Sequence, residues 1–112
     1  MKPDETPAAR FERSTARFRG DPDVTRGTGF GSNPGLRAHD RIFAMLARDA
    51  LVVKLPQTRV DELVAAGVAV RFDAGKGRPM REWASIAPDA DVDWEQLAIE
   101  ARTFADQRHQ GG

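Results

Sequence analysis

The sequence predicts a single α+β domain in which an antiparallel sheet of about five strands packs against three helices. Two observations carry this prediction. Apolar residues in the stretch 41–55 fall in two short runs joined by a tight turn, as in paired strands. In residues 60–67 and 94–105 they recur every three to four positions, as in amphipathic helices. At 112 residues the chain suits one hydrophobic core and is too short for two.

The centre of the predicted sheet is a hairpin of two apolar runs, residues 42–47 and 51–55. The residues between them, 48–50, leave room only for a tight antiparallel connection. The period of two places Ile42, Ala44 and Leu46 on one face of the first strand, and Phe43 and Met45 on the other. Because both faces are apolar, we expect this pair at the centre of a sheet that is covered on both sides.

Lys54 places a cation inside the otherwise aliphatic second strand of this hairpin. Two interpretations are open. The methylenes can lie along apolar surface while the ammonium reaches past the edge of the sheet, which long charged side chains commonly do. Alternatively, the ammonium contacts an anion on an open face of the sheet.

The first helix is expected to begin at Thr6-Pro7, with the hydroxyl as the cap and proline at the first helical position. Phe11, Thr15 and Phe18 then recur at helical spacing and form the buried stripe. Mostly away from this stripe lie three cations, Arg10, Arg13 and Arg17. Exposed charges of this kind usually serve solubility, so a solvated face is the simpler interpretation.

The second helix follows the hairpin, with either Pro56 in its first turn or Thr58 as its cap, and ends at Gly67. The last helix is capped by Asp93, with Gln96 at the capping-box position. Further short strands are expected over residues 36–38, 68–72 and 84–86, the first of them joined to the central hairpin by a turn at residues 39–40.

Several motifs follow one another in a characteristic order: FGS near residue 30, RIFAML, LVVKLP, RVDELVAAG, RFDAGKGRPMREW and a closing helix led by tryptophan. This series resembles the TfoX N-terminal domain family, which is related in shape to the MmcQ/YjbR group, over about residues 9–106. The resemblance implies a small bacterial regulatory or interaction domain, with nucleic-acid binding as a loose expectation. We place the domain at residues 8–107, between a flexible leader, 1–7, and a flexible tail, 108–112.

The glycine-rich loop of residues 73–82 is the candidate functional site. Backbone N–H groups between its glycines can form an anion-binding concavity, although no Ser or Thr follows the lysine as in a Walker loop. The loop can therefore contact phosphates through Lys76, Arg78 and Arg81, joined by Arg13 and Arg17 of the first helix. Alternatively its proline, methionine and tryptophan lock a crossover between strands, and the cations only face water.

Composition limits the classes of function. Lys+Arg and Asp+Glu balance at 17 each, which counts against a dedicated DNA-coating protein. The absence of cysteine removes disulfides and thiolate metal sites, and it fits a reducing cytoplasm. The N-terminal residues lack the apolar core of a signal peptide, and no apolar run has the length of a bilayer. We therefore expect a cytoplasmic protein with no membrane contact.

Catalysis is the least supported class of function. His39, in a turn, and His109, in the tail, have no carboxylates spaced around them for a metal site. Ser32 lacks the flanking glycines of a nucleophile elbow and stands where the third glycine of a dinucleotide fingerprint belongs. The sequence thus predicts a non-enzymatic module without metal or cofactor. Its partner is expected to be nucleic acid or, alternatively, a protein or second copy that pairs with a sheet edge or apolar patch.

Overall fold

The computed structural model describes residues 5–28, 34–73, 77 and 79–111. The strands are β1 (Val24–Thr28), β2 (Pro34–Ala38), β3 (Arg41–Ala47), β4 (Ala50–Lys54), β5 (Val70–Arg71) and β6 (Trp83–Ile86). The helices are α1 (Pro7–Ser14), α2 (Gln57–Ala65) and α3 (Trp94–Gly111), with a short 3-10 helix, η1 (Ala16–Gly20), after α1. The α+β class is confirmed, and the sheet has six strands instead of about five.

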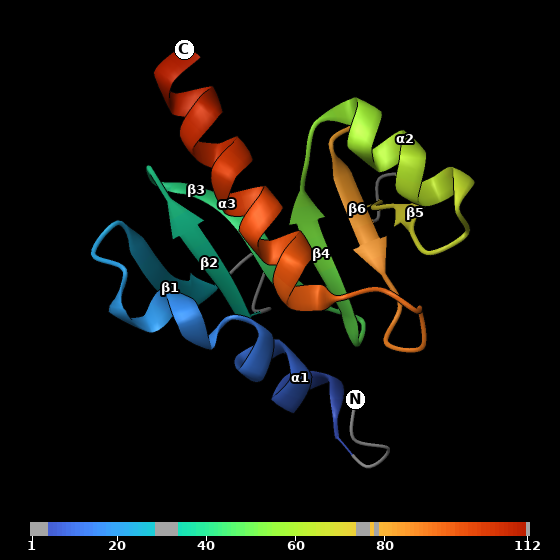
Figure 1. Ribbon diagram of the computed structural model, residues 1–112, viewed down its shortest axis with the longest axis horizontal. Helices are drawn as coiled ribbons and strands as arrows, with labels where there is room; N and C mark the ends of the chain where they lie inside the picture. The colour runs from blue at the N-terminus through green and yellow to red at the C-terminus, as the bar shows by residue number, and fades with distance from the viewer. Residues whose placement is uncertain (1–4, 29–33, 74–76, 78, 112) are drawn as a thin grey trace.

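The strands form one open antiparallel sheet in the order β1-β2-β3-β4-β6-β5, so the hairpin β3-β4 is central, as expected. Among the described residues, α1, α2 and α3 all contribute side chains to one core, on one face of the sheet (Figure 1). The other face carries a smaller apolar cluster of five buried residues, Met45, Ala47, Val52, Phe72 and Trp83. Both faces of the hairpin are therefore buried, as expected. One face lies under the helices, and the side chains of the other face are buried within this second apolar cluster.

Both hairpins that flank β3 close through two-residue turns with left-handed backbone. His39 and Asp40 have φ angles of 55° and 63°, and Arg48 and Asp49 have φ angles of 54° and 64°. Two consecutive residues in this region give the turn the right-handed twist of the strands it connects, which is why such turns are favoured in hairpins. The expected turn at residues 39–40 is confirmed, and it places His39 at the end of the sheet where β3 begins.

A β-bulge changes which residues of β3 face the helices. Consecutive residues of β2 pair with Ala44 and Ile42, so that Phe43 between them is an extra residue. Phe43 consequently packs with Ala44 and Leu46 in the core under the helices, whereas Ile42 and Met45 belong to the opposite face. The strict alternation expected from the sequence is therefore wrong at Ile42 and Phe43, because a bulge is specified by pairing with β2 and not by the apolar pattern.

Helix α1 begins as expected, since the Thr6 hydroxyl accepts a hydrogen bond from the Ala9 backbone N–H at 3.1 Å. Arg10, by contrast, does not lie on an exposed cationic flank. Its side chain is buried, with only 7% of the residue exposed, and its guanidinium donates to the carbonyls of Pro88 and Val92 at 2.6 and 3.1 Å. The guanidinium also lies 4.2 Å from the centroid of the Trp94 ring. The expectation for Arg10 is wrong because its partners are more than 75 residues away in sequence.

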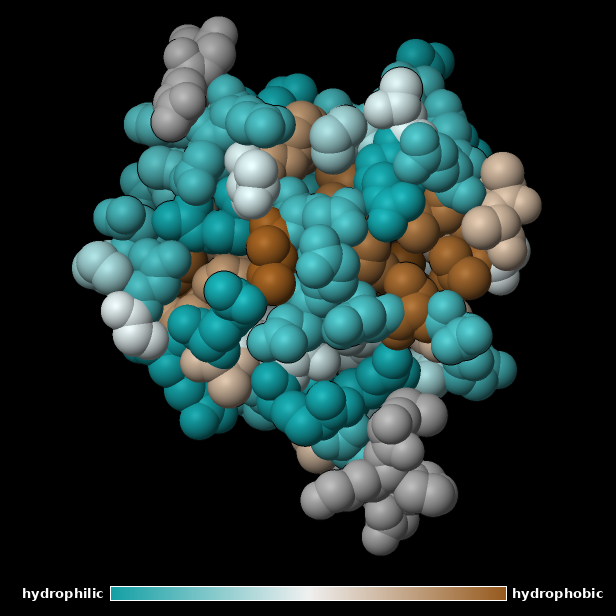
Figure 2. Space-filling view, viewed as in Figure 1, coloured by the Kyte–Doolittle hydropathy of each residue, from teal (hydrophilic) through white to brown (hydrophobic). Residues whose placement is uncertain are grey.

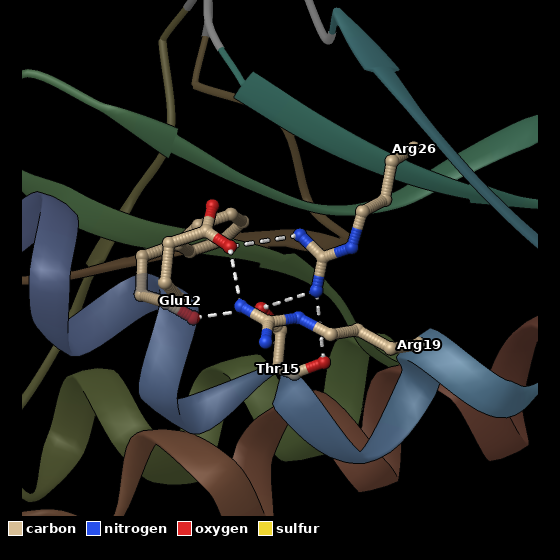
Figure 3. Close-up of polar contacts among 5 residues, drawn as sticks. Glu12, Thr15, Arg19 and Arg26 are labelled. Atoms are coloured by element: carbon tan, nitrogen blue, oxygen red, sulfur yellow. Dashed lines mark hydrogen bonds and ion pairs between the residues drawn. The ribbon is translucent and has the colours of Figure 1, made fainter.

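Polar contacts fasten the edge strand β1 to the turn after α1 (Figure 3). The Arg26 guanidinium donates to the backbone carbonyl and the hydroxyl of Thr15 at 3.1 and 3.3 Å, and to Glu12 at 3.2 Å. Arg19 reaches the same carboxylate oxygen of Glu12 at 3.4 Å. Glu12 and Arg26 therefore interact within the fold, and these two residues are not part of the candidate binding surface.

The structure shows where helices α2 and α3 begin and end. Thr58 lies inside α2, so it is not the cap, and Pro56 is the N-cap residue directly before the helix instead of lying in its first turn. Gly67 (φ +78°) ends the helix as expected, with the paired backbone hydrogen bonds of a Schellman motif. Asp93 caps α3 through the N–H groups of Glu95 and Gln96. Helix α3 continues to Gly111 and so includes most of the tail expected at residues 108–112. In the described part of the chain, no helix has the length and apolarity needed to cross a bilayer.

Candidate functional site

The cations expected to bind phosphate are not gathered at one place. Lys76 and Arg78 lie outside the described residues. Arg81 is exposed just before β6 begins, whereas α1 lies at the opposite end of this strand, where Arg10 contacts the residues that follow it. Arg13 of α1 forms a two-pronged ion pair with Glu5, at 2.8 Å for each nitrogen. Arg17, in η1, is exposed. Among the described candidates, Arg81 is thus separated from the two arginines of the first helical segment.

The fold gathers a different set of cations around a cavity of about 340 Å³, here called the α3 cavity. The C-terminal half of α3 passes over the end of the sheet where β3 begins and β4 ends (Figure 1). Residues of these elements line the cavity. Arg41 from β3, Lys54 from β4 and Arg108 from α3 all line it. No carboxylate is present among the described residues that form its wall. The local charge is therefore positive although the whole chain has none in excess.

Lys54 is the most unusual of the three cations because it is partly buried. Its ammonium lies 5.8 Å from the centroid of the Trp83 ring, and no ion pair to a described carboxylate involves it. Burial lowers the pKa of Lys54; the neighbouring Glu82 opposes this shift, while Arg108 and Arg41 add to it. The side chain thus reaches the end of the sheet, as the first sequence interpretation proposed, but it borders a cavity there.

Arg108 connects the last turns of α3 to the start of β6. Its guanidinium lies 3.3 Å from the Glu82 carboxylate and 5.6 Å from the centroid of the Phe104 ring, and about half of its side chain, 49%, remains exposed. Cations are favourable near a helix C-terminus, which accounts for Arg108 on electrostatic grounds. The same reason does not apply to Lys54, because Lys54 belongs to a strand.

The two histidines, expected in separate parts of the chain, meet at the rim of the α3 cavity. The rings of His39 and His109 are stacked, with centroids 4.0 Å apart and an angle of 5° between the planes. Nε2 of His39 lies 2.8 Å from a carboxylate oxygen of Asp106, which also pairs with Arg102. The hydrogen bond with His39 and the contact with Arg102 lower the pKa of Asp106. Across the described residues, no three His, Asp or Glu side chains come together in a way that could hold a metal ion.

The remaining wall of the cavity is apolar. It is formed by alanine residues of β2 and α3 and by Phe104, with the almost fully buried Phe43 behind them. Ile42 also lines the cavity, but its side chain packs with the cluster on the opposite face of the sheet. A concave, mostly apolar site with a few polar groups is typical of small-molecule binding. This arrangement can hold an anion that carries an apolar body, with the charge near the three cations and the body against α3.

Of this site, only Lys54 could be recognised from the sequence, because a cation within an aliphatic strand is uncommon. Arg41, Arg108 and His109 carry no such signal. They lie at the start of one strand and in the last turn of a helix, where exposed charges are ordinary. Strand pairing and the packing of α3 bring them next to Lys54, and neither could be read from local spacing.

A second surface bears on the expected protein-binding role. Val70 of the edge strand β5 is 64% exposed, and this strand covers only part of the one expected over residues 68–72. Val68 and Ala90 lie around the same surface hollow as Val70. The space-filling view shows an apolar area beside α2 at the β5–β6 end of the sheet (Figure 2). Pairing of a partner with this edge stays a prediction.

Comparison of the chain with models of protein families, with curated proteins and with solved structures finds no match. Assignment to the TfoX N-terminal domain family therefore stays a prediction from the ordered motifs. The functional proposal below depends on the α3 cavity and not on that resemblance.

Proposed function

We propose that this chain is a small, non-enzymatic regulatory module that binds a small organic anion in the α3 cavity. One observation carries the proposal: Arg41, Lys54 and Arg108, from three different elements, converge on a mostly apolar cavity that has no carboxylate among its described lining residues. The resemblance to the TfoX N-terminal domain family agrees with a regulatory role.

The position of Lys54 gives the physical reason. Moving its ammonium out of water without a carboxylate partner costs free energy of folding, and the nearby Arg108 and Arg41 increase this cost. An anion in the cavity supplies the missing partner in a region of low dielectric constant, where such an interaction is stronger than in water. Because the unfolded chain has no such site, binding stabilises the folded state.

Replacing Lys54 by methionine tests this proposal, because it has opposite effects on stability and on binding. Methionine keeps the length of the side chain and removes the desolvated charge, so we expect a higher melting temperature for the free protein at neutral pH. The stabilisation by added organic anions, measured by calorimetry at constant ionic strength, is expected to disappear in Lys54→Met. Arg17→Met, which removes an exposed cation of η1, serves as the matched control and keeps the anion effect.

The sign of the pH dependence follows from the direction of the pKa shift. Since the folded state lowers the pKa of Lys54, its stability cost is complete below that lowered pKa and disappears as the pH rises through it toward the unfolded value. The advantage of Lys54→Met in the free protein should therefore shrink in alkaline solution. The proposal is wrong if organic anions stabilise neither wild type nor variant, or if they stabilise both equally.

A second candidate function is sequence-independent contact with nucleic-acid phosphates by the loop of residues 73–82. The observation that favours it is the exposure of Gly77 and Arg81. Replacing Lys76, Arg78 and Arg81 together by alanine is expected to weaken binding to duplex DNA and to reduce its salt dependence. Fluorescence anisotropy in low salt measures this, with Arg19→Ala as the control. Undetectable binding of the wild type at low salt would exclude this function.

A further inference from the structure

We propose that the ligand of the α3 cavity is a monocarboxylate with a compact apolar body, such as an aryl acid, and not a phosphate ester. This inference rests on the function proposed above and specifies the chemical class of its ligand. It follows from two features of the cavity, the groups near its charged end and the size and nature of its wall.

The charged end of the cavity favours a single negative charge. Two of the α3 residues that line it, Arg108 and His109, belong to the last turn of the helix, where unpaired carbonyl groups give the helix end a partial negative charge. Sites for phosphate commonly use the opposite end of a helix, with its free N–H groups. Here the positive charge comes only from side chains, and Arg108 already forms an ion pair with Glu82. A second negative charge on the ligand meets the helix end and Glu82 as well as the cations, so it gains less here than at a helix N-terminus.

The side chains that provide the positive charge also suit a carboxylate. The forked guanidinium groups of Arg41 and Arg108 match the two oxygens of a carboxylate, and Lys54 supplies a compact charge beside them. Both arginines keep capacity for a ligand: Arg41 is exposed, and Arg108 is 49% exposed with a single carboxylate partner among the described residues.

The rest of the wall selects the body of the ligand. Phe104 presents an aromatic ring and Ala105 a methyl group along α3, whereas Phe43 and Ala101, which also line the cavity, are almost fully buried. A volume of about 340 Å³ lies at the lower end of the range for ligand cavities, roughly 300–1,000 Å³. The cavity therefore accepts a small body such as one aromatic ring, which packs against Phe104 at favourable ring geometry.

Three probes that share a phenyl ring separate the contributions: phenylacetate, its neutral counterpart phenylacetamide, which has nearly the same shape, and phenyl phosphate. Dissociation constants are measured by NMR titration of the full chain, with the methyl signal at position 105, from Ala105 in the wild type, as the reporter of the cavity. We expect phenylacetate to bind at least about tenfold more tightly than the amide, because only the acid has the charge-assisted contacts. Phenyl phosphate is expected to bind more weakly than phenylacetate.

Two variants complete the experiment. Lys54→Met should lower the affinity for phenylacetate toward that of the amide. Ala105→Leu narrows the cavity without changing its charge. It should weaken the binding of phenylacetate and of phenylacetamide alike, and leave the ratio of their dissociation constants unchanged. Tighter binding of phenyl phosphate would overturn the ligand class while leaving an anion site in place. Equal affinities for acid and amide would show that the cavity does not recognise a negative charge, and would overturn the anion site as well. If none of the three probes shifts the reporter signal, the proposed function itself is overturned.

Discussion

Replacing Arg10 by alanine is expected to lower the free energy of unfolding by about 3 kcal/mol. The change leaves two largely enclosed carbonyl groups, of Pro88 and Val92, without their charged donor. It also removes the guanidinium that packs on Trp94, which itself is almost fully buried. Through these contacts Arg10 joins α1 to the segment before α3, so its loss weakens the contact between the two helices. Urea unfolding at neutral pH measures the effect.

Arg17→Ala provides the matched control for this variant, because it removes the same side chain from an exposed position in the neighbouring helical turn. We expect it to change stability by less than about 0.5 kcal/mol. Arg10→Lys should lie between the two, since one ammonium cannot replace a fork that reaches two carbonyls. An Arg10→Ala protein as stable as the Arg17→Ala control would show that the buried guanidinium is not a structural anchor.

Phe43→Ala is expected to cost more, about 4 kcal/mol, because it removes a large side chain from the bulge of β3 and leaves a void beneath the helices. Phe43 is 1% exposed and belongs to the core that all three helices contribute to. Its ring meets that of Phe18 edge-on, with centroids 5.5 Å apart and an angle of 79° between the planes. The same urea unfolding curves measure this loss, with an unchanged denaturant slope showing that the fold is retained.

A double-mutant cycle isolates the contribution of this ring pair. Phe18→Ala, Phe43→Ala and the double variant should give a coupling energy of about 1 kcal/mol, as expected for an edge-to-face aromatic contact. Val70→Ala, at the exposed edge strand, is the control and should change stability by less than about 0.5 kcal/mol. A loss at Phe43 no larger than this control would mean that the bulge does not place Phe43 in the core.

Much of the fold could be predicted because local signals agree with the final structure. The cap of Thr6, the end of α2 at Gly67 and the central hairpin all depend on neighbours within a few residues. The errors have a common origin. Arg10 and the bulge at Phe43 depend on partners from distant elements, and nothing in the local spacing of charges or apolar residues reveals those partners.

The candidate site, too, could be predicted from the sequence only in part. The unusual chemistry of Lys54 is visible in the sequence, since an ammonium among aliphatic residues needs an explanation wherever the strand lies. The residues that surround Lys54 in space cannot be recognised from the sequence. Sheet pairing puts Arg41 beside the end of β4, and the packing of α3 on the sheet adds Arg108. The glycine-rich loop, by contrast, stands out in sequence, yet its one described arginine, Arg81, lies far from the arginines of α1 and η1.

The sequence by itself determined that this chain forms strands and helices around one core, because periodicity and capping act over a few residues. The tertiary structure alone decided that three cations and two histidines, from residues 39–54 and from the end of α3, surround one cavity. Burial and electrostatic interaction depend on distance in space, and only the completed packing of α3 against the sheet sets those distances.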